Sequence, residues 1–270
     1  MTAHPGFPTR TTLRELTPTL RLLPYELGEP TLTALYDSGP LSDPHGMRVQ
    51  ANMVTTLDGA VTGAHGSSRE ISSPADMRVF SVLRSLADAV VVGAGTARAE
   101  GYTRLAAKRA HLAQRRRRGQ ADVPALVLIT ASGRIDTDRL DAAGTSDVIV
   151  HTSCADEVTL DRLRGYCGDG NVVAHADEVS PAAVLADLRA RGMRRVLCEG
   201  GPALLGTWIQ AGVIDELCLT VSPLITGTGP GLLSGPTFDP PLRARPLSQL
   251  TDGSTAIHRL QLGPPDSPHR

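Results

Sequence analysis

The sequence predicts an α/β protein with a three-layer architecture, in which helices flank a mainly parallel central sheet. Two observations support this prediction: short apolar runs alternate with segments of helical periodicity, and most of the runs end in glycine or a polar residue. The clearest run, residues 196–199, is followed by Gly200, Gly201 and Pro202, and then by apolar residues at helical spacing as far as Gln210. We interpret this stretch as a buried strand, a tight turn and a helix.

The other elements follow from the same two patterns. Apolar runs predict strands at 47–55, 89–93, 125–130, 147–151, 171–174, 215–224 and 255–262. Helical periodicity predicts helices at 74–86, 97–100, 108–119, 158–163 and 181–191, capped at Ser73 and Ser180, and a short helix before residue 36 that Thr31 would cap. We expect a single domain over 47–265. The preceding residues 1–46 form an N-terminal extension that we expect to be partly disordered.

Composition and charge exclude several classes of protein. Hydrophobic residues make up 41% of the chain and charged residues 20%, and the net charge is −1, so no global field attracts nucleic acid or membranes. No apolar run is long enough to span a membrane, and the N-terminus lacks a signal-peptide core. The four cysteines show no metal-binding spacing. We therefore expect a soluble cytoplasmic protein with reduced cysteines and without a metal.

The Glu199-Gly200-Gly201 turn suits a phosphate-bearing ligand. Two glycines allow the backbone to approach a ligand closely, and the following helix offers unpaired N–H groups. The residues alone also fit an ordinary turn with a helix-terminal charge, and both interpretations stay open. The usual dinucleotide fingerprint GxGxxG is absent, and the segment 93–96, Gly-Ala-Gly-Thr, contains only its first half.

Four stretches resemble a known family. They are NMVTTLDGAVTG (52–63), SSREISSPADMRVFSVLR (67–84), ADAVVVGAGTARAEGY (87–102) and VLCEGGPALLGTWIQAGVIDELCLTVSPLITG (196–227). Together they resemble the pyrimidine reductase domain of bacterial riboflavin biosynthesis, which has a dihydrofolate-reductase-like fold. The resemblance covers about residues 47–235, and LLPYELGEPTLTALYD is also similar to stand-alone actinobacterial members.

This resemblance implies an NADPH-dependent reduction. In the family, the ribose of a ribosylamino-pyrimidine 5′-phosphate opens and receives hydride at C1′, which gives a ribityl chain. The implied substrate positions are Ser68, Arg84, Arg104 and Glu199. Together with the glycine-rich turns, the resemblance places cofactor contacts at Val54, Glu70, Gly93, Gly95, Thr96, Glu100, Gly200, Gly201, Pro202, Ala203, Leu204, Leu205 and Thr207.

Chemistry suggests a role for several of these residues. Arg84 and Arg104 suit a phosphate monoester, because a guanidinium can bind it with two hydrogen bonds. Asp58 and Glu199 are the acidic groups best placed to orient the substrate or relay the proton that accompanies hydride. In a loop after a strand, Ser132 and Arg134 are the preferred residues for the 2′-phosphate of NADPH.

Each role has a structural alternative. Asp58-Gly59 is a common turn dipeptide, and a lone arginine on a helix such as Arg84 is usually solvated. The arginine run at 115–118 could attract the 2′-phosphate or nucleic acid, but most such runs are solvated surface.

The chain departs from the family at two places. Glu70 stands where many members carry Trp, and Glu-Gly-Tyr at 100–102 stands where many carry Asp-Asp-Pro. The H-x-E and P-C-x-x-C motifs of the zinc deaminase domain are absent. Three functions therefore remain in view: the pyrimidine reductase, a dihydrofolate or pterin reductase, and a non-catalytic NADP-binding module. We also predict a homodimer, paired across a two-fold axis through the apolar segment 217–225.

Overall fold

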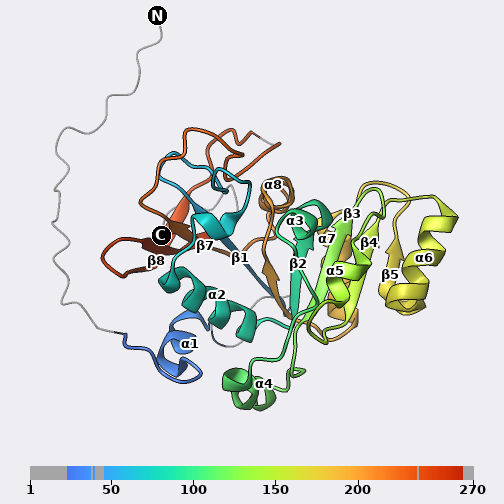
Figure 1. Cartoon of the computed structure of the whole chain (residues 1–270), viewed down its shortest axis with the longest axis horizontal. Helices are drawn as coiled ribbons and strands as arrows, with labels where there is room; N and C mark the ends of the chain where they lie inside the picture. The colour runs from blue at the N-terminus through green and yellow to red at the C-terminus, as the bar shows by residue number, and fades with distance from the viewer. Residues whose placement is uncertain (1–22, 38, 40–45, 236, 264–270) are drawn as a thin grey trace, which may run out of the picture.

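The computed structural model describes residues 23–37, 39, 46–235 and 237–263. Its centre is one nine-stranded sheet with the order β5-β4-β3-β2-β6-β1-β7-β9-β8 (Figure 1). The strands are β1 (Arg48–Thr55), β2 (Ala89–Gly93), β3 (Ala125–Thr130), β4 (Val148–Thr152), β5 (Val172–Ala174), β6 (Arg195–Cys198), β7 (Glu216–Val221), β8 (Ala244–Thr251) and β9 (Ala256–Leu262). Neighbouring strands are parallel except where β9 pairs with β7 and β8. The predicted mainly parallel sheet is confirmed.

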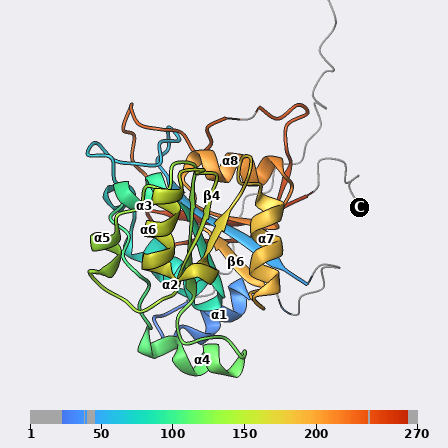
Figure 2. The same cartoon turned by 90° about the vertical axis from the view of Figure 1, so that its right-hand side faces the viewer.

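Helices cover both faces of this sheet. They are α1 (Pro30–Tyr36), α2 (Pro74–Leu86), α3 (Ala94–Ala99), α4 (Leu112–Arg117), α5 (Thr137–Asp141), α6 (Glu157–Cys167), α7 (Pro181–Ala190) and α8 (Pro202–Gln210). Buried side chains of α1, α2, α3, α5 and α6 share one hydrophobic cluster, and those of α7 and α8 belong to a second. Figure 2 shows the two sets of helices on opposite sides of the strands. The three-layer architecture is as expected.

The helix starts follow the local sequence. Ser73 accepts a hydrogen bond from the backbone of Asp76 at the start of α2, and Ser180 does the same for Ala183 at the start of α7. In both helices proline occupies the first turn, where its missing N–H leaves no bond unmade. Both predicted caps are confirmed.

The structure differs from the predicted fold in two respects: it contains two further elements, and one predicted helix cap is wrong. The structure contains α5 and the edge strand β8, neither of which is predicted; β8 is largely exposed and contains a proline, so it has no continuous apolar run. The N-cap of α1 is Glu29 rather than Thr31. Leu32 of α1 is buried in the same cluster as α2, so this part of the N-terminal extension packs onto the sheet layer. Residues 1–22 and 40–45, where disorder and a linker are expected, lie outside the described residues.

The arginine run at 115–118 is a solvated surface only in part, because Arg116 and Arg117 are exposed. Arg115 is 3% exposed and donates to the main-chain carbonyls of Ala87 and Ala121, at 2.7 Å each. The bond to Ala87 attaches α4 to the end of α2. Arg115 therefore serves packing, whereas Arg116 and Arg117 are surface charges.

The residues that the structure describes contain neither a membrane-spanning helix nor a metal-binding cluster. No helix there has both the length and the apolar composition to cross a membrane. No group of three or more His, Cys, Asp or Glu side chains within those residues could hold a metal ion. The cysteines are unpaired, and Cys198 and Cys218 are buried in the sheet.

Candidate active site

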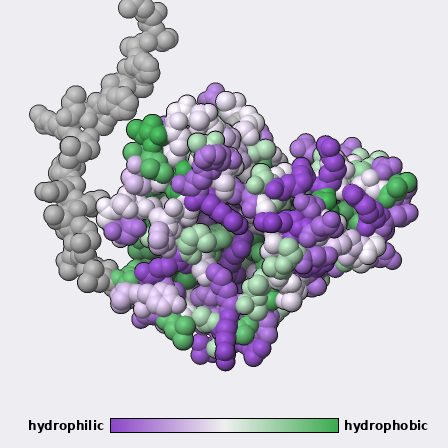
Figure 3. Space-filling model, in the orientation of Figure 1, coloured by the Kyte–Doolittle hydropathy of each residue, from purple (hydrophilic) through white to green (hydrophobic). Residues whose placement is uncertain are grey.

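A cavity of about 760 Å³ opens where β1, β2 and β6 end. Its walls come from β1, α2, α3, the segment that follows α3, and the turn between β6 and α8. The ends of neighbouring parallel strands meet at one edge, which is where open α/β sheets bind their ligands. Hydrophilic side chains run down the middle of this face towards α4 (Figure 3). Of the residues predicted to bind substrate or cofactor, the cavity is lined by Val54, Ser68, Arg84, Gly95, Thr96, Glu100, Arg104, Glu199, Gly201 and Pro202.

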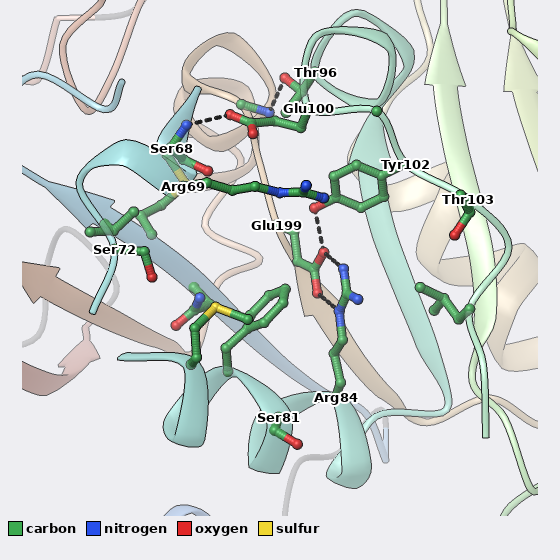
Figure 4. Close-up of a pocket in the computed structure, with 18 of the residues that line it drawn as sticks. Ser68, Arg69, Ser72, Ser81, Arg84, Thr96, Glu100, Tyr102, Thr103 and Glu199 are labelled. Atoms are coloured by element: carbon green, nitrogen blue, oxygen red, sulfur yellow. Dashed lines mark hydrogen bonds and ion pairs between the residues drawn. The ribbon is translucent and has the colours of Figure 1, made fainter. Parts of the chain in front are cut away.

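Glu199 is bound on both oxygens by its neighbours. It follows β6, and the Nε and Nη2 atoms of Arg84 on α2 donate to its two oxygens, each at 2.7 Å. The hydroxyl of Tyr102 donates to Oε2 at 2.6 Å (Figure 4). We call these three residues the cavity triad. The sequence singled out Arg84 and Glu199 but not Tyr102, whose only signal was the departure at 100–102.

The cavity triad is held largely away from water. The Glu199 side chain is 2% exposed and that of Arg84 26%. Burial alone would lower the pKa of Arg84, but the charge and hydrogen bonds of Glu199 outweigh it and raise that pKa. Burial, and then the nearby carboxylate, raise the pKa of Tyr102 well above its usual 10. The triad therefore contains an ion pair and a neutral phenol.

Local structure explains the position of Tyr102. After α3, Gly101 adopts a left-handed conformation with φ of +64°, which favours glycine. The N–H of Tyr102 then bonds back to the carbonyl of Ala97 at 2.8 Å, which folds the chain over the end of α3. The guanidinium carbon of Arg84 lies 5.5 Å from the centre of the Tyr102 ring and 4.2 Å from that of Phe80. Arg84 is thus in contact range of two aromatic rings.

The turn after Glu199 is tightly fitted to α3. The Gly200–Gly201 peptide bond is cis, and the N–H of Gly201 donates to the Thr96 hydroxyl at 2.9 Å. A Cβ at Gly201 would lie 2.6 Å from that hydroxyl, which only glycine avoids. No side chain caps the N-terminus of α8. Its first N–H groups can therefore bind an anionic ligand.

Glu100 connects α3 to the other wall. Its carboxylate accepts from the Ser68 N–H at 2.8 Å and from the Ser67 hydroxyl at 2.9 Å. The side chain of Arg69, in the same segment, extends across the cavity towards Tyr102 (Figure 4). Glu100 therefore fixes the loop that carries Ser68 and Arg69.

Lys108 brings an uncompensated positive charge to the end of the cavity near α4. Its ammonium donates to the Ser81 hydroxyl at 2.9 Å, and His111 lies 3.2 Å from the same oxygen. Burial, and then the charge of Arg84, lower the pKa of Lys108. Within the described part of the chain, Arg69 and Lys108 are the lining Lys and Arg residues with no hydrogen bond or ion pair to a carboxylate or main-chain carbonyl.

Asp58 does not line the cavity. It lies in the exposed turn after β1, and its carboxylate accepts from the Thr56 hydroxyl and from the N–H of Gly227 at 2.6 Å. These two bonds, the Thr56 bond first, lower the pKa of Asp58 to about 2. An ionised carboxylate that holds a loop is a poor proton donor. The structure therefore supports the turn interpretation of Asp58.

Glu70 is likewise a structural residue. Its side chain and that of Ser67 form a reciprocal capping box around the short helix Ser68–Glu70, and it also pairs with His65. Glu70 does not line the cavity. The carboxylate that stands where many family members carry Trp is therefore explained by its hydrogen bonds within the loop. Six further residues that were expected to bind the cofactor do not line the cavity: Gly93, Gly200, Ala203, Leu204, Leu205 and Thr207. Leu205 is fully buried in the core, so its predicted contact with a cofactor is wrong.

Arg104 belongs to a second group with the chemistry of the cavity triad. Its Nε donates to Asp141 at 2.8 Å, Tyr166 donates to the same carboxylate at 2.6 Å, and the guanidinium carbon is 5.1 Å from the Tyr166 ring centre. We call Arg104, Asp141 and Tyr166 the surface triad, because Asp141 is 55% exposed. The Arg104 guanidinium is thus occupied, which weakens its predicted role in binding phosphate.

Ser132 and Arg134 lie beside a separate cavity of about 520 Å³. Arg134, Arg98 and Arg162 line it, and the Ser132 hydroxyl is 3.4 Å from Nε of Arg134. Arg98 belongs to α3, whose first turn lines the main cavity. One short helix therefore links the two cavities.

Comparison with known proteins places the chain in a family. Residues 47–257 match the RibD C-terminal domain. A 2,5-diamino-6-ribosylamino-4(3H)-pyrimidinone 5′-phosphate reductase of Archaeoglobus fulgidus is 27% identical over 78% of this chain and 97% of its own length. One of Methanothermobacter thermautotrophicus is 31% identical over 65% of this chain and 77% of its own.

A solved structure shows the same fold. A pyrimidine reductase-like protein from Corynebacterium diphtheriae superposes with a TM-score of 0.71 at 24% identity, covering 87% of this chain and 99% of that protein. The resemblance stated from the sequence is confirmed. The chain belongs to the RibD C-terminal domain family of riboflavin-biosynthesis reductases and is an oxidoreductase.

Proposed function

We propose that this protein reduces 2,5-diamino-6-ribosylamino-4(3H)-pyrimidinone 5′-phosphate, or the corresponding 5-amino-6-(5-phosphoribosylamino)uracil, to the ribitylamino product. The substrate is taken from the names of the two relatives described above. The observation that carries the proposal is the cavity triad, because it places a buried, ionised carboxylate in a cavity large enough for such a ligand. In this reaction one hydride is added to C1′ of the ribose and one proton is taken up.

The residues present fit NADPH as the hydride donor. The uncapped start of α8 and the Gly201 turn leave a close-fitting edge with free N–H groups, which suits a pyrophosphate. Val54 and Thr96 line the same part of the cavity. Ser132 and Arg134, with Arg98 beside them, would hold a 2′-phosphate at the second cavity. When bound, the cofactor supplies the hydride.

We assign the substrate phosphate to Lys108 rather than to Arg104. Lys108 lies near Arg84, and its ammonium pairs with no carboxylate in the described residues, whereas Arg104 is bound to Asp141. An ammonium that contacts a hydroxyl, with a second cation nearby, suits a phosphate monoester. Binding there would set the distance of the ribose from Glu199.

We assign to Glu199 the stabilisation of positive charge on the substrate. Opening of the ribose ring gives a positively charged C1′–N iminium, and an ionised carboxylate in a low-dielectric site stabilises such a cation strongly. Arg84 and Tyr102 keep Glu199 in one orientation. Asp58 has no step in this proposal, because it lies outside the cavity.

The test is NADPH oxidation with two substrates in parallel, the ribosylamino-pyrimidine phosphate and dihydrofolate. We expect turnover of the first alone. Turnover of dihydrofolate alone would replace the proposal by a folate reductase, and NADPH binding without any turnover would replace it by a binding module. NADH in place of NADPH tests the 2′-phosphate assignment, and equal rates with both would overturn it.

We also propose a homodimer, through the C-terminal end of the predicted segment 217–225 rather than through its strand. Both edges of β7 are paired within the sheet, so its residues cannot form a new strand pair across a two-fold axis. Beyond β7, however, Leu224 is 43% and Ile225 75% exposed, and Leu57, which is 62% exposed, bonds to Leu224. Light scattering is expected to give a dimer, and Ile225→Asp to weaken it; a monomeric wild type would refute the proposal.

A further inference from the structure

Tyr102 makes a contact that the proposed chemistry does not by itself require. Its phenol oxygen lies 2.6 Å from Oε2 of Glu199, in the carboxylate that would face the reacting carbon. The Tyr102 ring lines the cavity, and Figure 4 shows its hydroxyl pointing at Glu199 from the side opposite Arg84. We propose that Tyr102 is a positioning residue, which fixes the orientation and hydrogen bonding of Glu199 for the reaction. This inference rests on the proposed function.

Counting hydrogen bonds shows what the contact does. A carboxylate has about four acceptor positions. Among the described residues, Nη2 of Arg84 and the Tyr102 hydroxyl occupy Oε2, and Nε of Arg84 occupies one position on Oε1. One position on Oε1 remains for a donor in the cavity. Without Tyr102, Glu199 would offer two positions on different oxygens, and its interaction with the ligand would be less defined.

The surroundings of Tyr102 suit this positioning role. Its main-chain N–H is bound to Ala97, and Gly101 gives the turn that directs the ring into the cavity. The phenol keeps its proton because burial and the adjacent Glu199 charge raise its pKa. The hydroxyl is therefore a permanent donor to Glu199 at physiological pH. A fixed donor needs no reorganisation when charge develops in the transition state.

The first test is Tyr102→Phe, which removes the hydroxyl and keeps the ring near Arg84. We expect kcat to fall about ten-fold with KM changed less than about three-fold, because a charge-assisted hydrogen bond to Glu199 is lost and the fixed carboxylate acts in the transition state. A kcat within two-fold of wild type would overturn the proposal. So would a loss confined to KM.

The surface triad supplies a matched control. Tyr166→Phe removes a phenol that donates to Asp141 at the same distance of 2.6 Å, outside the cavity. We expect kcat and KM to stay within two-fold. An equal loss of kcat in both variants would show a general effect on the fold and overturn the assignment.

A second test needs no substrate and separates this inference from the proposed function. The chain has four tyrosines, and their ionisation is followed by ultraviolet absorbance as pH rises. In Glu199→Gln the adjacent charge is gone while Arg84 remains, so the pKa of Tyr102 falls, although burial, the larger cause, still keeps it raised. The alkaline tyrosine titration is therefore expected to begin at a lower pH than in the wild type, and Glu199→Gln/Tyr102→Phe must lose that shift.

The two failures are then distinguishable. If the wild type reduces no pyrimidine but the tyrosine titration shifts in Glu199→Gln, the proposed function fails and the contact between Tyr102 and Glu199 stands. If the wild type is active and Glu199→Gln shows no shift, the positioning inference fails alone.

Discussion

The cavity triad and the surface triad have the same chemistry in different surroundings. Each joins an arginine, a carboxylate and a tyrosine, with a phenol-to-carboxylate distance of 2.6 Å. In the cavity, the arginine binds through two nitrogens and the carboxylate side chain is 2% exposed. On the surface, only one nitrogen of Arg104 contacts the carboxylate, which is 55% exposed. The two triads therefore make similar contacts, but only the carboxylate of the cavity triad is buried.

This difference determines what each group can contribute. An exposed ion pair contributes little to stability, because water screens it. A buried pair must overcome a large desolvation penalty, and an apolar replacement of the same shape would often be as stable. Stability therefore does not explain the cavity triad. Its position at the end of β6, in the wall of the cavity, favours the proposed role in the reaction.

The largest effect is expected for the carboxylates. Glu199→Gln removes the charge that stabilises the iminium and leaves Arg84 buried without its partner. We expect kcat/KM to fall by about 10³-fold and the free energy of unfolding to fall by about 3 kcal/mol. Asp141→Asn, the equivalent change in the surface triad, should leave both nearly unchanged. Steady-state kinetics measure kcat/KM, and urea unfolding measures the free energy of unfolding. Equal losses in Glu199→Gln and Asp141→Asn would contradict the difference between the two triads.

A smaller effect is expected for the arginines. Lysine keeps the charge but cannot bind a carboxylate through two parallel hydrogen bonds. Arg84→Lys should therefore lower kcat/KM about 30-fold, while Arg104→Lys should change it less than two-fold, since only one nitrogen contacts Asp141. If Arg104→Lys instead raises KM strongly, Arg104 binds the substrate phosphate as the sequence suggested.

The sequence predicted the sheet better than the site. Strands such as 89–93 and 125–130 are buried apolar runs bounded by turns, and their limits are correct to within a residue. The exposed strand β8 carries no such pattern and was missed. Glu199 was recognisable because it closes a strand before two glycines. Tyr102 was not, because its contact with Glu199 joins positions 97 residues apart and depends on the turn at Gly101.

Local structure also decided between alternatives that the sequence left open. Asp58 and Glu70 are acidic residues in loops, and nothing in their spacing separates a catalytic carboxylate from one that holds a turn. In the structure, both side chains form hydrogen bonds that hold their loops. For Arg84 the structure favours the site rather than the structural alternative. Its guanidinium is not solvated on the helix surface but is bound to Glu199 in the cavity.

Lys108 extends the comparison to a cation outside both triads. Its ammonium lies near Arg84 but pairs with no described carboxylate. Lys108→Ala is expected to raise KM for the phosphorylated substrate about ten-fold, by loss of a charge-assisted hydrogen bond, with little change in kcat. The matched control is Arg117→Ala, because Arg117 is an exposed cation of α4 that does not line the cavity. An unchanged KM in Lys108→Ala would show that the substrate phosphate binds elsewhere, and Arg69 would then be the next candidate.

The smallest effect is a pH dependence that also separates Lys108 from the triads. Its pKa lies below the usual 10.5, because burial and then Arg84 disfavour the charged form. The charge that attracts phosphate is therefore present at low pH and is lost as pH rises through this lowered pKa, earlier than for a solvated lysine. Since kcat/KM reports the free enzyme, its alkaline fall should begin below pH 10.5. Lys108→Arg, which stays charged, should remove that fall. An identical alkaline fall in the two proteins would assign it to another group and leave Lys108 without a role in binding.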